Sequence, residues 1–227
     1  GLRKPTAPSF HAFSMPQSTI LPKPLQKPHP PMWVAVTSPG TELDAADRGM
    51  GSLGLTFGGF KEQEKKIAEY RRRIKYCDPV GSFVNEQVNT VNFLMCHPDL
   101  QYGAKAGQRL AGTFNYMAEQ LLAARQAYPT RSYPNLGLLP ALRREATSSP
   151  EGQIPEGLAI GNPDRIVEVI KNWESVGVDR INFLLNAAET IPQQEVLDSM
   201  RLFAKEVMPK FADKKSPVAA GTAAGGD

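Results

Sequence analysis

The sequence has little cysteine and no long apolar run. Cys77 and Cys96 are its only cysteines and belong to no CxxC pair, which argues against both a disulfide framework and a zinc site. We predict a reduced protein of the cytoplasm. No run of about 18 apolar residues occurs, so we predict no membrane-spanning segment. No apolar stretch precedes the first prolines as it would in a signal peptide.

Neither sign of charge predominates. The chain carries 26 Lys and Arg against 23 Asp and Glu, a net charge of +3, so we expect no nucleic-acid partner. The densest basic run, 71–73, has Glu62, Glu64 and Glu69 interleaved with its neighbours, which is typical of a solvated helix face. A hydrophobic content of 41% over 227 residues is enough for a sizeable core.

Proline and glycine are concentrated in certain segments of the chain. Residues 1–31 contain Pro5, Pro8, Pro16, Pro22, Pro24, Pro28, Pro30 and Pro31. Proline removes a backbone donor, so we predict that this segment is an extended arm. Its apolar side chains predict that the arm packs on the half-barrel formed by residues 32–213. Residues 128–159 lack periodicity and are predicted to form a lid-like loop, although such loops can also bind ligands or be disordered. The Ala/Gly-rich tail, 214–227, is predicted to be disordered.

Short apolar runs alternate with helical patterns between these segments. Strands are expected at about 32–36, 53–57, 88–96 and 181–185, with helices at 42–48, 61–76, 101–127 and 191–211 and another between Asn162 and Gly177. Four strand–helix units predict a parallel α/β sheet equal to half of a (β/α)8 barrel. A doubly wound open sheet is the alternative. No GxGxxG follows the first strand, which weakens the dinucleotide-binding form of that fold.

Helix ends and buried faces are predicted from individual residues. Asn162 is expected to cap its helix, with Pro163 in the first turn and a left-handed Gly177 at the end. Thr190 and Gln193 form a possible capping box for the last helix. Apolar residues at helical spacing predict one buried face on each of two helices. The helix at 101–127 has Phe114, Met117, Leu121 and Leu122 on this face, and the last helix has Val196, Met200, Phe203 and Val207.

Several segments, in order, resemble a known family. They are PKPLQKPHPPMWVA at 22–35, TSPGT at 37–41, AADRG at 45–49, IGNPDRI at 160–166, GVD at 177–179, INF at 181–183 and FAKEVMP at 203–209. Together they resemble the later half of luciferase-like flavin-dependent monooxygenases, over about residues 10–212. The resemblance implies the C-terminal half of a TIM-type barrel, completed by another chain or a missing segment.

The resemblance implies an oxidoreductase that uses reduced FMN and dioxygen to oxygenate a small organic substrate. A separate reductase would supply the flavin, and the enzyme would be inactive without its N-terminal half. Three alternatives remain: a deazaflavin F420-dependent hydride-transfer enzyme, a non-catalytic partner subunit, and a different α/β enzyme that binds a phosphorylated sugar or nucleotide.

Candidate site residues follow the ends of strands. By the resemblance Thr37, Ser38 and Thr41 bind the flavin phosphate, and independently they open a helix after a strand, where N–H groups and the helix dipole attract an anion. Ser38 or Thr41 could instead simply cap that helix. Asn186, at the end of the last strand, is a weaker candidate for flavin or substrate. His97 is expected to begin a loop. No metal site and no catalytic residue are predicted.

Overall fold

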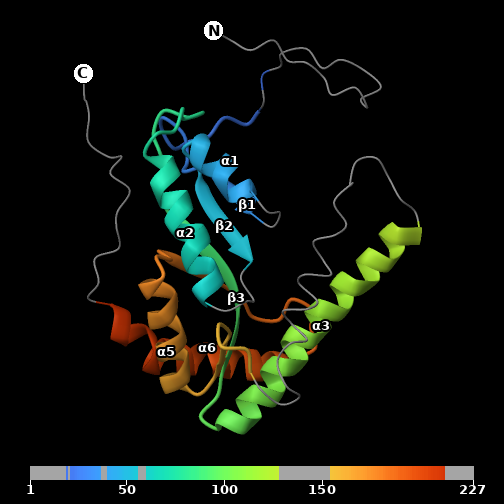
Figure 1. The fold of residues 1–227 in the computed structure, drawn as a ribbon. Coiled ribbons are helices and arrows are strands. Elements are labelled where there is room, and N and C mark those ends of the chain that lie inside the picture. Colours follow the sequence, from blue (N-terminus) through green and yellow to red (C-terminus); the bar gives the residue numbers. More distant parts are fainter. Residues whose placement is uncertain (1–18, 20, 37–39, 56–59, 128–153, 213–227) are drawn as a thin grey trace. The chain divides into compact units, whose positions relative to one another are not determined.

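The structure is a computed structural model that describes residues 19, 21–36, 40–55, 60–127 and 154–212 (Figure 1). The chain divides into residues 1–30 and residues 31–227. Most of the predicted arm, most of the predicted loop 128–159 and the predicted tail lie outside the described residues. In the described part of the chain, no helix is long and apolar enough to cross a membrane.

Strands and helices alternate along the second unit. In chain order they are β1 (Trp33–Val36), α1 (Thr41–Asp47), β2 (Gly51–Leu55), α2 (Phe60–Ile74), β3 (Val88–Cys96), α3 (Leu100–Ala127), β4 (Ala159–Gly161), α5 (Pro163–Ser175), β5 (Arg180–Leu184), α6 (Gln193–Glu206) and the 3₁₀ helix η2 (Met208–Phe211).

Every strand pairing in the sheet is parallel, as predicted. β1 pairs with β2, and β2 pairs with the first residues of β3. β3 is the longest strand and pairs also with β5, through Asn89–Phe93, and with β4, through Leu94–Cys96. The three-residue β4 was not predicted, because a strand this short has no periodicity of its own and here it joins the end of a longer loop.

The two faces of the sheet are covered differently. Alternate residues point to opposite faces, so the register separates a first face with Val34, Val88 and Phe183 from a second face with Ala35 and Asn182. The first face packs against α1, α2, α5 and α6. On the second face Ala35 and Asn182 are exposed. Among the described helices, α3 covers its carboxyl end, together with Val196 of α6.

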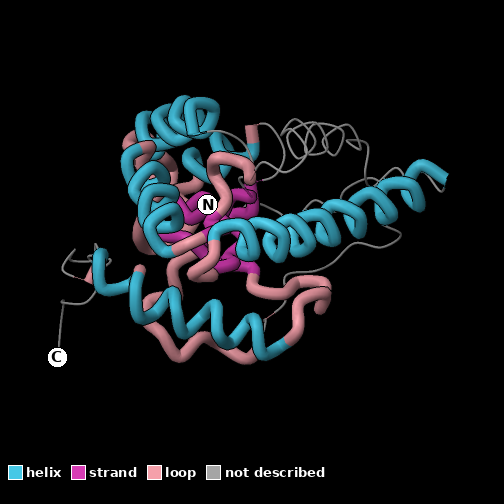
Figure 2. Tube along the Cα trace, turned by 90° about the horizontal axis from the view of Figure 1, so that it is seen from below, coloured by secondary structure: helices cyan, strands magenta, loops and turns pink. Residues whose placement is uncertain are grey.

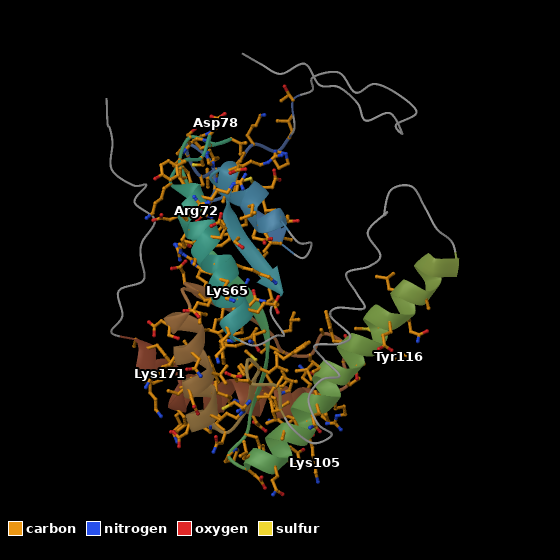
Figure 3. All side chains as sticks on the ribbon, viewed as in Figure 1. Lys65, Arg72, Asp78, Lys105, Tyr116 and Lys171 are labelled. Carbon is orange, nitrogen blue, oxygen red and sulfur yellow. The ribbon has the colours of Figure 1, made fainter. Side chains whose placement is uncertain are left out.

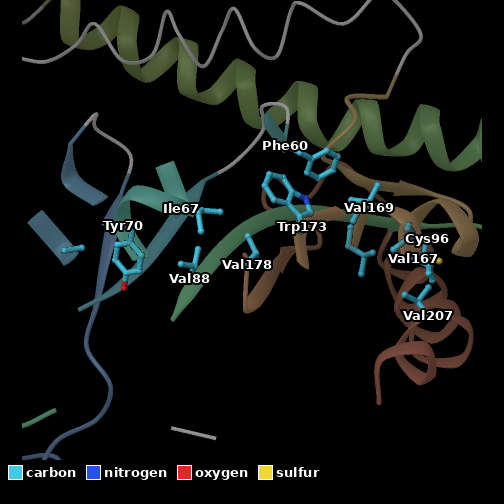
Figure 4. Close-up of a cluster of buried hydrophobic side chains, with 14 of the residues drawn as sticks. Phe60, Ile67, Tyr70, Val88, Cys96, Val167, Val169, Trp173, Val178 and Val207 are labelled. Carbon is cyan, nitrogen blue, oxygen red and sulfur yellow. The ribbon is translucent and has the colours of Figure 1, made fainter. Parts of the chain in front are cut away.

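The core of the first face is built around Trp173. This side chain is fully buried, and its ring meets Phe60 edge to face at a centroid distance of 4.7 Å (Figure 4). Tyr70 is also buried, and its hydroxyl donates to the carbonyl of Met50 at 2.8 Å. Burial raises the pKa of Tyr70. Large aromatic side chains account for much of the apolar area buried in such a core.

The predicted ends of α5 are confirmed. The side chain of Asn162 accepts a hydrogen bond from the backbone N–H of Arg165 at 3.1 Å, and Pro163 is the first helical residue. Gly177 has a φ of 96°, in the left-handed region where glycine carries no Cβ penalty. The helix is therefore delimited by local chemistry that the sequence displays directly.

The predicted start of the last helix was wrong. α6 begins at Gln193, its N-cap is Pro192, and no side chain caps it. The hydroxyl oxygen of Thr190 is buried without a hydrogen bond. Proline at 192 explains the shift, because its fixed φ suits the residue just before the helix and it offers no N–H for a capping box.

Two predicted helix faces are only partly buried. On α3, Met117 is 42% exposed and Leu121 is 59% exposed, and on α6 Met200 is 42% exposed. The helical spacing is real, but the sheet ends before the second half of α3, which extends beyond the strands (Figure 2). Tyr116, labelled in Figure 3, is a further exposed apolar residue of this half, at 60%.

Candidate functional site

The carboxyl ends of the strands lie at one edge of the sheet because all pairings are parallel. In barrel and open α/β folds, this is the edge where ligands bind. The structure describes four of the turns that leave it: part of the turn from β1 to α1, the turn from β3 to α3, the turn from β4 to α5 and the loop from β5 to α6. Residues 56–59, which follow β2, lie outside the described residues.

The turn after β1 carries the predicted phosphate residues. Thr37 and Ser38 lie outside the described residues, and Thr41 is the first residue of α1. Gly40 is the N-cap, with a φ of 86°, so Thr41 does not cap the helix. A Cβ at Gly40 would meet nothing within 4 Å, which leaves open space beside the turn. The Asp44 carboxylate in this helix is paired with Arg48 at 3.0 Å.

The loop after β5 is organised by Asn186. Its amide nitrogen donates to the carbonyl of Ile191 at 2.9 Å, and its side-chain oxygen accepts from the Ile191 N–H at 3.1 Å. These two bonds fix the turn that leads into α6. A role for Asn186 toward flavin or substrate stays a prediction, and it would have to use the remaining amide proton or the second lone pair of the side-chain oxygen.

The turn after β3 is built from His97 and Asp99. The Asp99 N–H donates to Nδ1 of His97 at 3.0 Å, and the Asp99 carboxylate accepts from the backbone N–H groups of Gln101 and Tyr102. Those backbone donors hold the pKa of Asp99 below its usual value. His97 belongs to this turn, as expected, and its ring lies 4.4 Å from the ring of Tyr102 at an angle of 33°.

Three charged or polar side chains meet where α3 passes α6. Tyr102 and Arg109 lie two turns apart on the same side of α3, and Glu195 lies in the first turn of α6. The Glu195 carboxylate, as a hydrogen-bond acceptor and as a charge, raises the pKa of Tyr102. Nη2 of Arg109 lies 3.9 Å from Oε2 of Glu195, an attraction between charges but too long for a hydrogen bond.

This cluster has unfilled hydrogen-bonding capacity. Oε2 of Glu195 is buried and has no hydrogen-bond partner. The cluster borders the apolar group that joins α3 to the second face, which includes Phe93, Leu110 and Ile191. It therefore stands beside the carboxyl end of the sheet, where α3 and the first turn of α6 both pack.

A buried polar node fixes β4 beside this edge. Asn92 is fully buried; its amide nitrogen donates to the carbonyl of Gly157 at 2.7 Å, and its oxygen accepts from the Ala159 N–H at 3.1 Å. The indole N–H of Trp173 donates to the same Gly157 carbonyl at 2.9 Å. The residues that lead into β4 are thus tied to the core from inside the protein.

Sequence reasoning missed both the cluster and the node. Tyr102 and Arg109 show a spacing of two helical turns, which is a usable signal, but nothing in the sequence indicates that Glu195 faces them. Asn92 falls in a strand pattern where an asparagine suggests an exposed position. Among the described residues no three His, Cys, Asp or Glu side chains gather as possible metal ligands.

Comparisons with known proteins agree with these observations. No family model matches the chain. The oxygenase component of a flavin-dependent trigonelline monooxygenase from Acinetobacter baylyi is 22% identical over 208 residues, which cover 89% of this chain and 54% of that protein. The relationship to a flavin-dependent monooxygenase confirms the predicted resemblance.

Solved structures share the fold. Monooxygenase RslO1 from Streptomyces bottropensis matches with a TM-score of 0.61 at 20% identity, over 91% of this chain and 55% of that one. The oxygenating constituent of 3,6-diketocamphane monooxygenase from Pseudomonas putida, solved with FMN, matches with a TM-score of 0.53 at 17% identity, over 80% and 49%. The chain spans about half the length of each of these proteins.

Proposed function

Starting from this relationship, we propose that the chain is part of a flavin-dependent monooxygenase of the luciferase superfamily, which oxygenates a small organic substrate. The observation that carries the proposal is the sequence relationship to an oxygenase component over 89% of the chain. Bound reduced flavin would supply the activation of dioxygen. The residues of this chain would bind the cofactor, orient the substrate and keep water from the reacting atoms.

The proposed cofactor is FMN, delivered in its reduced form by a separate reductase in the cytoplasm. The name of the relative, an oxygenase component, supports a two-part system of this kind. The two free cysteines, Cys77 and Cys96, are compatible with a reducing compartment. F420 is the alternative cofactor, and the absorption spectrum of the bound chromophore distinguishes it from FMN.

Thr37, Ser38 and Thr41 are the residues that we propose for the flavin phosphate. The open space at Gly40 and the start of α1 fit such a group, and Arg48 offsets the charge of Asp44 close to it. We expect the triple variant T37A/S38A/T41A to weaken FMN binding about tenfold or more, measured by quenching of flavin fluorescence. Thr113→Ala is the matched control, since that hydroxyl bonds only to the Arg109 carbonyl of its own helix. Equal FMN affinity in the triple variant and the control would remove the site.

The proposal includes a second half that completes a barrel. A parallel sheet is normally covered on both faces, but Ala35 and Asn182 are exposed on the second face. The lengths of the relatives support the same interpretation, because each is about twice as long as the matched region.

Native mass spectrometry of the purified protein, with and without added FMN, tests the proposal. We expect an oligomer, either with a companion chain or with a second copy, that retains flavin mass. A lone folded chain of 24.8 kDa that ignores flavin would contradict the completed barrel and favour the alternative of a non-catalytic partner subunit. Turnover is expected only in the complete assembly.

A further inference from the structure

The cluster of Tyr102, Arg109 and Glu195 lies between α3 and the first turn of α6. It borders the carboxyl end of the second face, where α3 packs over Phe93 and Met95. The ring of Phe93 meets Phe114 of α3 edge to face at 5.4 Å, so this part of α3 is held against the sheet. The polar groups beside this apolar contact are therefore fixed in place rather than carried on a loop.

The cluster is chemically incomplete. Buried oxygens normally have a hydrogen-bond partner, and leaving one unpaired costs about 1–3 kcal/mol. Oε2 of Glu195 is such an oxygen. No described residue accepts a hydrogen bond from the Arg109 side chain, whose nearest charge contact is the 3.9 Å approach to Glu195. An acceptor and a donor thus lie side by side, each with free capacity.

This pair of groups selects among ligands by charge. A carboxylate near Arg109 would be repelled by Glu195, and an ammonium near Glu195 would be repelled by Arg109. A neutral hydroxyl fits both, because its O–H can donate to Oε2 of Glu195 while its oxygen accepts from the guanidinium of Arg109. Each of these bonds would include one charged partner and be stronger than a neutral one.

The neighbouring rings favour an aromatic ligand. Tyr102 is 44% exposed, and the His97 ring beside it is partly exposed, with ring centroids 4.4 Å apart. Offset or edge-to-face packing on such a surface is favourable for another ring. The Tyr102 hydroxyl neighbours Glu195, so the rings and the carboxylate belong to one surface.

We propose that Arg109 and Glu195 form a subsite for the hydroxyl group of a phenol, with Tyr102 and His97 as its aromatic wall. Its use as a substrate subsite rests on the proposed monooxygenase function.

The test compares three small probes on the purified protein by isothermal titration and ligand-observed NMR. Phenol has both donor and acceptor, anisole lacks the donor, and benzoate carries the negative charge. We expect phenol to bind about tenfold more tightly than either of the others, roughly the value of one hydrogen bond to a charged group. Equal affinity for phenol and anisole, or no detectable phenol binding, would overturn the proposal.

Variants assign the effect to the named residues. Arg109→Ala is expected to weaken the binding of both phenol and anisole, because each has an oxygen that accepts from the guanidinium, and Glu195→Ala is expected to remove the preference for phenol over anisole. Arg201→Ala, also on α6 and paired only with Asp198, is expected to retain it. Glu195→Gln keeps the side-chain shape if the alanine variant is unstable, and it should reduce the preference and weaken repulsion of benzoate. A preference that survives both Glu195 variants would contradict the assignment.

FMN titration of the same samples separates this inference from the function on which it rests. Phenol preference without FMN binding would support the subsite and remove the monooxygenase assignment. FMN binding without phenol preference would leave the proposed function standing and remove the subsite.

Discussion

At the amino end of the sheet, Arg71 of α2 makes three hydrogen bonds through its guanidinium. It donates to the Asp179 carboxylate at 2.6 Å and to the carbonyls of Glu86 and Gly177 at 2.7 and 3.1 Å, and Asp179 in turn accepts from the Val88 N–H. At the carboxyl end, Arg109 has only a 3.9 Å approach to Glu195. Arg71 links the residues at the starts of β3 and β5, whereas the guanidinium N–H groups of Arg109 donate to no described residue.

The difference separates a contact that stabilises the fold from a cluster for which we propose a ligand. A saturated network is worth most to the folded state because removing one member leaves several partners unpaired. An unsaturated cluster contributes little to folding and retains the capacity to bind. This agrees with the general division in barrel folds, where the amino face serves stability and the carboxyl face carries the site.

The largest effect is expected from Arg71→Ala. The change removes an ion pair whose side chains are 31% and 21% exposed, together with two hydrogen bonds to carbonyls. We expect a loss of about 3 kcal/mol in the free energy of unfolding. Urea denaturation measures it. A loss below about 1 kcal/mol would show that the amino end is no better anchored than the carboxyl end.

Asn92→Leu tests a polar contact that stabilises the carboxyl end of the sheet, because it removes the hydrogen bonds of the buried Asn92 side chain. The side chain of leucine is similar in size but leaves the Ala159 N–H without its acceptor, while Gly157 keeps its bond from Trp173. We expect a loss of about 2 kcal/mol. Hydrogen exchange at Ala159 should accelerate in the variant. Unchanged exchange there would mean that β4 does not depend on Asn92.

Arg109→Ala is the counterpart of the Arg71 variant. Its side chain is 51% exposed and makes only the long contact with Glu195, so the free energy of unfolding should change by less than about 0.5 kcal/mol. The same urea denaturation experiment measures this. A loss comparable to that of Arg71→Ala would contradict the view that Arg109 is not used for stability.

The smallest effect concerns pH and the N-cap of α3. Backbone N–H groups of Tyr102 and Gln101 lower the pKa of Asp99 from its usual 3.8, so the ionised form stabilises the fold above that pH, and this contribution is lost as pH falls through the lowered value. Asp99→Asn keeps a capping side chain but cannot titrate.

The difference in Tm between wild type and Asp99→Asn should therefore be present at pH 6 and shrink toward pH 3. Other carboxylates with lowered pKa, such as Asp47 beside Arg73, titrate in both proteins and cancel in the difference. A gap that is the same at both pH values would remove Asp99 as the cause.

The local features of the fold were largely predictable, and the long-range ones were not. The cap at Asn162, the left-handed Gly177 and the span of β3 follow from neighbouring residues alone. The capping box predicted from Thr190 was wrong because the N-cap of α6 is Pro192, although the spacing of the motif was right. The exposure of Met117 and Leu121 depends on where the sheet ends, which helical periodicity does not contain.

The sequence indicated at which edge of the sheet candidate residues would lie, but not which side chains would contact one another there. The predicted strand ends do share one edge of the sheet, and His97 lies in a turn there, as expected. The contact between α3 and α6 joins residues about 90 positions apart in the sequence, and no local pattern specifies it. Of the predicted phosphate residues, only Thr41 falls within the described residues, so that site stays a prediction.

The central place of β3 has a consequence for how the chain is made. β1, β2 and β3 are synthesised in order and pair with near neighbours, but Asn89 pairs with Arg180, roughly 90 residues later. Closing so long a loop carries an entropic cost that grows only slowly with length, but it cannot occur until the later strand has left the ribosome. During that interval one edge of the longest strand is unpaired, and nascent chains halted before β5 are the species most prone to associate with one another.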